Sequence, residues 1–528
     1  MKTGHKNLRV GVDVGGTNTD AVLMCGSAII ASTKSPTTRS VREGIVKAIS
    51  AIITSSGADA SDVSFVSIGT THFTNAFVQR RNLDSVGVIR IALPAAQALP
   101  PMTDWPADIS SVLGGHTITV RGGYQYDGRV NADLDELAVA DAARQFKSRN
   151  LNSIALSALF APVNDAMELR AAEIISHEHP DCAITLSSRI GRIGLLEREN
   201  AGIMNASLVT LARDTVTGFK SALEELGIAA PFYVSQNDGT LMSADFVEQY
   251  PVLTFASGPT NSMRGAAYLS GLKDALVADI GGTTTDIGVL SNGFPRESSV
   301  MVDIGGVRTN FRMPDIIAIG LGGGSIVTLP KGGGVQIGPQ SVGYNITTQA
   351  VVFGGETLTA TDLAVAAGYA DIGDRSRVAR LDKRMIEDGV TEMHRLVEAG
   401  LDRMKTSGDA APLVLVGGGS VLINRDLKGI SEVRTHSDAG VANAIGASIA
   451  KIGGETDKVY SYDVEGREAA MEDAIASAKA RAVAAGAGAD SLEIMDIEEL
   501  PLAYVPGGAV RLRVKVAGDL AAAGVNQR

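Results

Sequence analysis

Two short segments of the chain place an aspartate directly before paired glycines and hydroxyl side chains. Residues 13–20 read DVGGTNTD, and residues 279–286 read DIGGTTTD. Each segment lies between two apolar runs, a pattern that predicts a strand, a tight turn and a second strand. Such a turn gathers backbone N–H groups and hydroxyls in one concavity that suits phosphate oxygens. The two segments therefore predict a pair of phosphate-binding turns.

The residues expected to contact phosphate are the glycines and threonines of both turns, namely Gly15, Gly16, Thr17, Gly281, Gly282, Thr283 and Thr284. Asp13 and Asp279 stand at the ends of the first strands. There they can hold Mg²⁺ through its water shell, because this small cation keeps most of its waters and bridges to phosphate oxygens. We therefore expect Mg²⁺ at both aspartates, and a catalytic set made of Asp13, Asp279, Thr17 and Thr283.

One such turn by itself is equally well explained as an ordinary hairpin. A single structural turn does not account for two copies that repeat both the leading aspartate and the trailing Thr-Asp. Neither copy has the G-x-G-x-x-G spacing followed by a helix, and the motif G-x-x-x-x-G-K-[ST] is absent from the sequence. The sequence therefore favours paired hairpins over the other common phosphate-binding loops.

A third glycine-rich element follows the apolar run 413–416 and comprises Gly417, Gly418 and Gly419. Its backbone can pass close to a flat purine ring or a ribose. In their order along the chain, the two hairpins and this element resemble the phosphate and adenosine motifs of actin, Hsp70 and sugar kinases. The resemblance implies that ATP is the nucleotide and that the fold is α/β, an actin-like pair of lobes.

The length of 528 residues exceeds the roughly 100 to 200 residues of one domain. Two similar hairpin segments more than 200 residues apart indicate two related lobes rather than a solenoid. We expect an N-terminal actin-like lobe at residues 1–205, a second actin-like lobe at residues 206–455 and a small C-terminal α/β domain at residues 456–528. Within the last, residues 468–485 predict a helix, and residues 491–497 and 509–516 predict strands.

The composition excludes several classes of protein. Lys and Arg number 47 against 59 Asp and Glu, and the resulting net charge of -12 opposes a nucleic-acid or anionic-membrane surface. Only Cys25 and Cys182 occur, too few for a disulfide scaffold, and we find neither a secretory leader nor an apolar span of about 20 residues. We therefore expect a cytoplasmic enzyme that acts on a small molecule, with neither nucleic acid nor membrane as a partner.

Most of the first 455 residues also resemble the hydantoinase A and oxoprolinase family. Residues 69–76 (GTTHFTNA) resemble its GTT-x-x-TNA motif, and residues 257–259 resemble its SGP motif. After the second hairpin, Asp315, residues 322–325 and residues 361–362 follow in the family's order. The residues expected to contact substrate lie in the first of these motifs: Thr70, Thr71, His72, Thr74 and Asn75.

Thr74 and Asn75 can hydrogen-bond a neutral amide without a shifted pKa. His72 has two interpretations, either a contact to substrate or metal, or a histidine satisfied by hydrogen bonds in the first turn of a helix. The sequence also departs from the family: Ile68 stands where many relatives have histidine, and residues 315–318 lack the His-Thr that tends to follow the aspartate. Both departures argue against a transition-metal site that relied on those histidines.

The resemblance implies that ATP phosphorylates the carbonyl oxygen of a hydantoin, imide, oxoproline or lactam, and that hydrolysis follows at a separate subunit or domain. Amide resonance makes the carbonyl carbon a poor electrophile, whereas an O-phosphorylated amide carries a good leaving group. No G-x-S-x-G elbow and no HExxH occur in the chain. We therefore expect a hetero-oligomer with a hydantoinase B-type subunit.

Other functions would use the same ATP elements. The family also includes ATP-dependent ketone carboxylases, which phosphorylate an enolate. A small-molecule kinase of the sugar-kinase type would need an aspartate to deprotonate a hydroxyl. A non-enzymatic switch of the actin or Hsp70 type would have no reason to carry the GTTHFTN segment.

Overall fold

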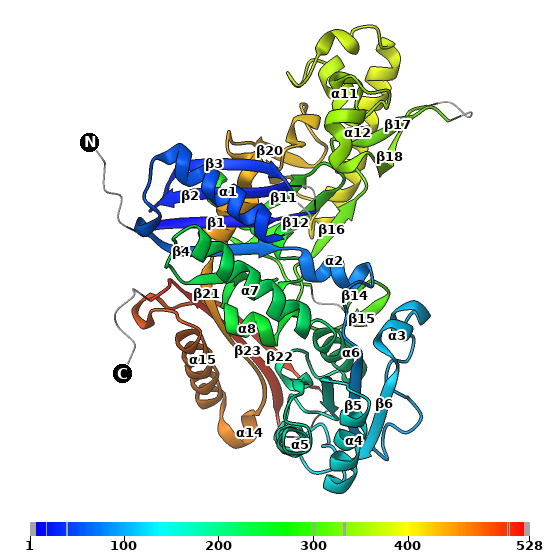
Figure 1. The fold of residues 1–528 in the computed structure, drawn as a ribbon, viewed down its shortest axis with the longest axis vertical. Helices are drawn as coiled ribbons and strands as arrows, with labels where there is room; N and C mark the ends of the chain where they lie inside the picture. The colour runs from blue at the N-terminus through cyan, green and yellow to red at the C-terminus, as the bar shows by residue number, and fades with distance from the viewer. Residues whose placement is uncertain are drawn as a thin grey trace.

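The structure is a computed structural model that describes residues 7–16, 18–37, 41–298, 301–330, 334–503, 505 and 507–521. Its first large element is a nine-stranded sheet with the order β22-β23-β21-β10-β9-β4-β1-β2-β3 (Figure 1). The strands are β1 (Leu8–Val14), β2 (Asn18–Cys25), β3 (Ala28–Pro36), β4 (Val63–Thr70), β9 (Phe232–Ser235), β10 (Thr240–Ser243), β21 (Lys451–Ser461), β22 (Glu493–Pro501) and β23 (Ala509–Gly518).

Strand β1 lies between β4 and β2 in this sheet, and almost all of its side chains are buried. It is antiparallel to β2 and parallel to β4. The first hairpin turn and the C-terminal end of β4 therefore lie at the same end of these strands. Helices α1 (Val41–Ser56) and α7 (Val209–Glu225) pack against each other, and α1 also packs on β1, β2 and β3. The buried face of α1 carries Ile45, Ile49 and Ile52 at helical spacing.

The second lobe contains a sheet with the order β13-β12-β11-β19-β20, and β16 pairs with β12 beside β13. Its strands are β11 (Ala275–Ile280), β12 (Thr285–Ser291), β13 (Phe294–Pro295), β16 (Ile316–Ile319), β19 (Ala411–Val416) and β20 (Ile430–Arg434). Strand β11 is antiparallel to β12 and parallel to β19, which repeats the relation of β1 to β2 and β4. The repeated sequence therefore forms a repeated topology, and the expected actin-like, two-lobed α/β fold is confirmed.

Two helices cross between the lobes with their backbones in contact. Helix α9 (Ser257–Ser270) packs on β11, β12 and β19, and helix α13 (Ala442–Ser448) packs on β1, β2 and β4. A side chain at Gly265 would overlap the backbone oxygen of Ala442, and one at Gly446 would overlap that of Asn261. The two glycines therefore permit a helix crossing that brings the sheets of the two lobes together.

A further sheet, all parallel, lies within residues 1–205 and projects from the first lobe (Figure 1). It has the order β6-β5-β7-β8 and consists of β5 (Val86–Leu93), β6 (His116–Arg121), β7 (Ser153–Ala158) and β8 (Ala183–Leu186). Helices α4 (Glu136–Ser148) and α5 (Ala166–Glu178) pack on each other beside it. Among the described helices, none is both long and apolar enough to cross a membrane.

The C-terminal residues form the expected helix, α15 (Arg467–Ala484), together with strands β22 and β23. The helix packs on β21 and β23 through Ala470, Ala474, Ala478 and Ala482, all of them buried. Strand β21 extends across position 455 and pairs with β10, so these residues continue the first sheet. The three-part division of the chain remains a prediction, and the first sheet combines strands from all three of the predicted parts.

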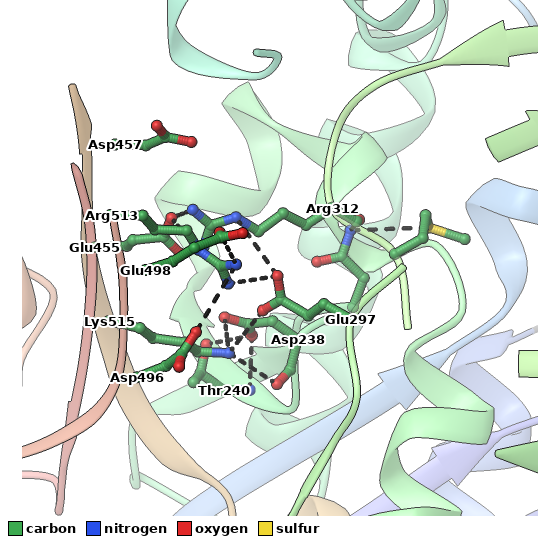
Figure 2. A network of polar contacts seen from close by, with 12 residues as sticks. Asp238, Thr240, Glu297, Arg312, Glu455, Asp457, Asp496, Glu498, Arg513 and Lys515 are labelled. Atoms are coloured by element: carbon green, nitrogen blue, oxygen red, sulfur yellow. Dashed lines mark hydrogen bonds and ion pairs between the residues drawn. The ribbon is translucent and has the colours of Figure 1, made fainter. Parts of the chain in front are cut away.

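A buried network of charged side chains fixes these C-terminal strands to the middle of the chain (Figure 2). Arg513 and Lys515 of β23 both contact Glu297, and Arg312 contacts Glu455 of β21. Glu297 and Arg312 lie between β13 and β16 of the second lobe. Removal of one partner would leave an unpaired buried charge, which destabilises a protein strongly.

Candidate functional site

Four carboxyl groups gather where the two hairpin turns meet. Asp13 faces Asp20 across the first hairpin, and Asp279 faces Asp286 across the second. Lys34 pairs with Asp20, and its Cε lies 4.0 Å from a Cβ built at Gly418, next to Gly417, where a Cβ would overlap Asp279 Oδ1. The two hairpins therefore lie near each other. The structure therefore brings Asp13 and Asp279, the expected Mg²⁺ residues, into one site.

Asp13 is held by one amide from each of the two crossing helices. The side-chain amide of Asn261 on α9 donates to Oδ1 at 3.2 Å, and that of Asn443 on α13 donates to Oδ2 at 3.1 Å. Asn443 also donates to Asp20 Oδ2 at 2.8 Å. Each carboxylate oxygen has about two lone-pair positions, so each Asp13 oxygen keeps one free for a ligand. Sequence reasoning missed Asn261, Asn443 and Asp20, although Asn261 stands two residues after the SGP motif.

Glycines make room for the two aspartates and leave the turns open. A side chain at Gly69 would overlap Asp13 Oδ1, and one at Gly417, whose φ is +84°, would overlap Asp279 Oδ1. In contrast, a Cβ added at Gly16 or Gly282 meets nothing within 4 Å. Each turn is therefore unobstructed at its second glycine, as a phosphate-binding turn would require.

The second turn is supported from behind by the glycine run at 322–324. The amides of Gly323 and Gly324 donate to the carbonyls of Gly281 and Gly282 at 3.0 and 2.7 Å. A Cβ at Gly322 would lie 2.5 Å from the backbone nitrogen of Thr283. This family motif therefore shapes the turn. Thr17, which we expected in the catalytic set, lies outside the described residues.

The segment 69–76 lies beside the first turn, because the amide of Thr71 donates to the carbonyl of Val14 at 3.3 Å. Helix α2 (His72–Val78) begins within it, and Thr70 Oγ1 accepts from the amide of His72 at 3.1 Å. Asn75 Nδ2 donates to Thr71 Oγ1 at 3.2 Å. Thr74 Oγ1 is buried without a hydrogen-bond partner among the described residues, and an unpaired buried hydroxyl of this kind can serve a ligand.

Burial determines the protonation of the site. It raises the pKa of Asp13 to about 6 and, together with the charge of Asp279, that of Asp286 to about 7. Burial also raises the pKa values of Asp20 and Asp279. The positive charge of Lys34 lowers both pKa values in part, but burial has the larger effect. The raised pKa values favour the neutral form, so the site carries less negative charge near pH 7 than four fully ionised aspartates would. Among the described residues no three His, Cys, Asp or Glu side chains are grouped so that they could hold a metal ion, so Asp13 and Asp279 would hold Mg²⁺ largely through its waters. Burial also lowers the pKa of His72.

Two other residues of the family motifs have structural partners. Asp362 completes the capping box of helix α11 (Ala360–Ala366), whose N-cap is Thr359, and accepts from the amides of Val352 and Thr359, each at 2.7 Å. Asp315 forms an ion pair with Arg296 at 2.6 Å. Both residues therefore stabilise the second lobe around the turn.

We expect Asp286 to make the stability of the metal-free protein depend on pH. Its pKa is about 7 in the folded protein against an ordinary value of 3.8, so between these values the folded state binds a proton that the unfolded state has lost. The free energy of unfolding therefore falls as the pH rises from about 4 to about 7. The substitution Asp286→Asn removes this loss.

Urea unfolding in EDTA checks this expectation. The stability advantage of Asp286→Asn over the wild type should widen between about pH 5 and pH 7 and stay constant above it. Asp388→Asn on the exposed face of α12 (Lys383–Met404) is the matched control and should show no such trend. A gap that does not change with pH would contradict the raised pKa of Asp286.

Several curated proteins with similar sequences are named as subunits of two kinds of enzyme. The caprolactamase subunit alpha of Pseudomonas jessenii is 26% identical over 395 residues, covering 68% of this chain and 54% of that subunit. The acetophenone carboxylase gamma subunit of Aromatoleum aromaticum is 29% identical over 260 residues, covering 47% of this chain and 35% of that subunit. The chain thus spans about half or less of the length of these relatives.

A solved structure supports the fold. The ATP-dependent caprolactamase from Pseudomonas jessenii matches with a TM-score of 0.79 at 20% identity, over 97% of this chain and 88% of that chain. Residues 9–179 match the hydantoinase/oxoprolinase N-terminal region, and residues 198–374 match the hydantoinase/oxoprolinase region that follows it. These matches include both hairpins, the segment 69–76 and helix α9 with its SGP motif. The chain therefore belongs to the hydantoinase/oxoprolinase family.

Proposed function

We propose that this protein uses ATP to phosphorylate the carbonyl oxygen of a cyclic amide, so that a partner subunit can hydrolyse the ring. The observation that carries the proposal is the pair of open glycine turns that meet at Asp13 and Asp279. Phosphoryl transfer requires mainly positioning and charge neutralisation, which such turns and Mg²⁺ supply. The name of the caprolactamase relative supports a lactam among the candidate substrates.

In this proposal the glycines and threonines of both turns hold the phosphates, and residues 417–419 lie against the adenosine. Asp13 and Asp279 hold Mg²⁺ through its waters. Thr71, Thr74 and Asn75 face the amide, because they lie beside the first turn and Thr74 Oγ1 is unpaired. The terminal phosphoryl group passes from ATP to the carbonyl oxygen and leaves ADP. One water then adds to the activated carbon, the C–N bond breaks as the ring nitrogen takes up a proton, and an acyl phosphate remains. A second water releases the phosphate and leaves a carboxylate.

The partner in this proposal is a B-type subunit. Its support is that three of the matching relatives are named as subunits, namely the caprolactamase alpha, acetophenone carboxylase gamma and acetone carboxylase beta subunits. A second candidate function, ATP-dependent carboxylation of a ketone, rests on the two carboxylase relatives. In that reaction the same turns would activate an enolate instead of an amide.

The test combines the purified chain with its co-expressed partner and supplies ATP, Mg²⁺ and either cyclic amides or ketones with bicarbonate. We expect amide-stimulated release of phosphate and ring opening that requires both proteins. Ring opening by the isolated chain at the rate of the mixture would contradict the division of labour. Turnover only with ketone and bicarbonate would establish the second candidate, and a stable phosphorylated product would indicate a kinase.

A further inference from the structure

Lys34 reaches from the first sheet to the second lobe. It lies on β3, and its ammonium forms an ion pair with Asp20 Oδ2 at 2.8 Å. The same Nζ donates to the backbone oxygen of Gly440 at 2.9 Å. Gly440 belongs to the short turn Ala439–Val441 that leads into α13. One side chain thus joins β2, β3 and the entry to the helix that crosses between the lobes.

The turn that Lys34 contacts is itself attached to the second sheet. The amide of Gly417 donates to the backbone oxygen of Ala439 at 2.9 Å, and Ala439 packs in one apolar cluster with Val414 and Val416 of β19. A Cβ at Gly418 would lie 4.0 Å from Lys34 Cε. The stem of Lys34 therefore lies next to the third glycine element.

Lys34 also acts electrostatically on both hairpins, since its charge lowers the pKa values of Asp20 and of Asp279. Its side chain is 37% exposed, whereas that of Asp20 is 3% exposed. The ammonium can therefore turn toward a ligand, while Asp20 stays in place through Asn443. An anionic phosphate chain that enters a site rich in carboxylates needs positive charge, and a lysine ammonium is a common phosphate partner.

We propose that Lys34 contacts the nucleotide phosphates and fastens the two lobes around them. With no nucleotide, the ammonium pairs with Asp20. With ATP, it turns to a phosphate oxygen and keeps its hydrogen bond to Gly440. This inference rests on the proposed function only in taking ATP as the ligand. If Lys34 were only a structural ion pair, its partly exposed pairing would contribute little to stability and nothing to affinity.

The experiment measures binding of ATP, ADP and AMP to the full chain by calorimetry with Mg²⁺ and without any amide. Lys34→Met should weaken ATP binding by about 10- to 100-fold and AMP binding much less, because a charged hydrogen bond to phosphate is lost. Lys34→Arg should restore most of the affinity. Lys47→Met, on the exposed face of α1, removes the same charge elsewhere and should bind as the wild type does.

The variant Asp20→Asn separates a nucleotide contact from a structural pair. It frees the ammonium, so its ATP affinity should equal or exceed that of the wild type and clearly exceed that of Lys34→Met. A purely structural pair would give the two variants the same ATP affinity. Wild-type affinity in Lys34→Met would overturn the inference. If the wild type binds ATP but opens no amide, only the amide assignment fails. A wild type that binds no ATP would overturn both.

Discussion

Asp279→Asn is expected to lower ATP turnover about a thousandfold and to leave the protein folded. In the proposed function this carboxylate would hold Mg²⁺ for phosphoryl transfer, and the loss of one preorganised charge of this kind costs about 10²- to 10³-fold in rate. Burial raises the pKa of Asp279, so the neutral amide removes a charge that is costly to bury. The stability of the variant should therefore equal or exceed that of the wild type. Asp13→Asn should behave in the same way.

The measurement is steady-state phosphate release with the partner present, alongside urea unfolding of each variant. Asp388→Asn serves as the control, since its pair with Arg384 at 3.8 Å is exposed and contributes little. Gly282→Val should also abolish turnover, because its side chain would fill the open face of the second turn. Normal turnover in both aspartate variants would show that the turns are ordinary hairpins.

Gly446→Ala is expected to destabilise the protein by about 3 kcal/mol, the upper part of the range for overpacking. A single added Cβ on α13 would overlap the backbone oxygen of Asn261 on α9, and a backbone atom cannot move aside as a side chain can. The helices must separate, which also draws Asn261 and Asn443 away from Asp13. Gly265→Ala should have a similar effect, since its Cβ overlaps the backbone of Ala442.

The control for this prediction is Gly218→Ala in the middle of α7, where an added Cβ meets nothing within 4 Å. There the change should stabilise the helix by about 0.5–1 kcal/mol. Urea unfolding midpoints and ATP turnover report both effects. Equal stability of the Gly446 and Gly218 variants would contradict the close crossing of α9 and α13.

The hairpins could be predicted from sequence because their signal is local: apolar strands, paired glycines and hydroxyls follow one another directly. Helix α15 and strands β22 and β23 also carry local patterns. The amides around Asp13 could not be found in this way, because Asn261 and Asn443 come from helices far apart in the chain. Their position depends on a crossing of two helices, and no periodicity encodes that crossing.

The sequence also did not indicate which distant strands pair with each other. Leu241 of β10 lies opposite Ile452 of β21, and a strand pattern states that a segment is extended but not which neighbour it finds. No motif in the sequence singles out Lys34. Only the folded chain brings it to Gly440 and to the acidic site.

The first sheet has a consequence for how the chain folds during synthesis. Strand β10 is translated about two hundred residues before β21, the strand that covers its edge, so the sheet that contains Asp13 stays unfinished until the C-terminal strands emerge. Long-range strand pairing of this kind forms slowly, and until it forms the unpaired edge of β10 can pair with incorrect strands. The strands of the second lobe can therefore leave the ribosome before β21 does, so the pairing of β21 with β10 decides when the sheet around Asp13 is complete.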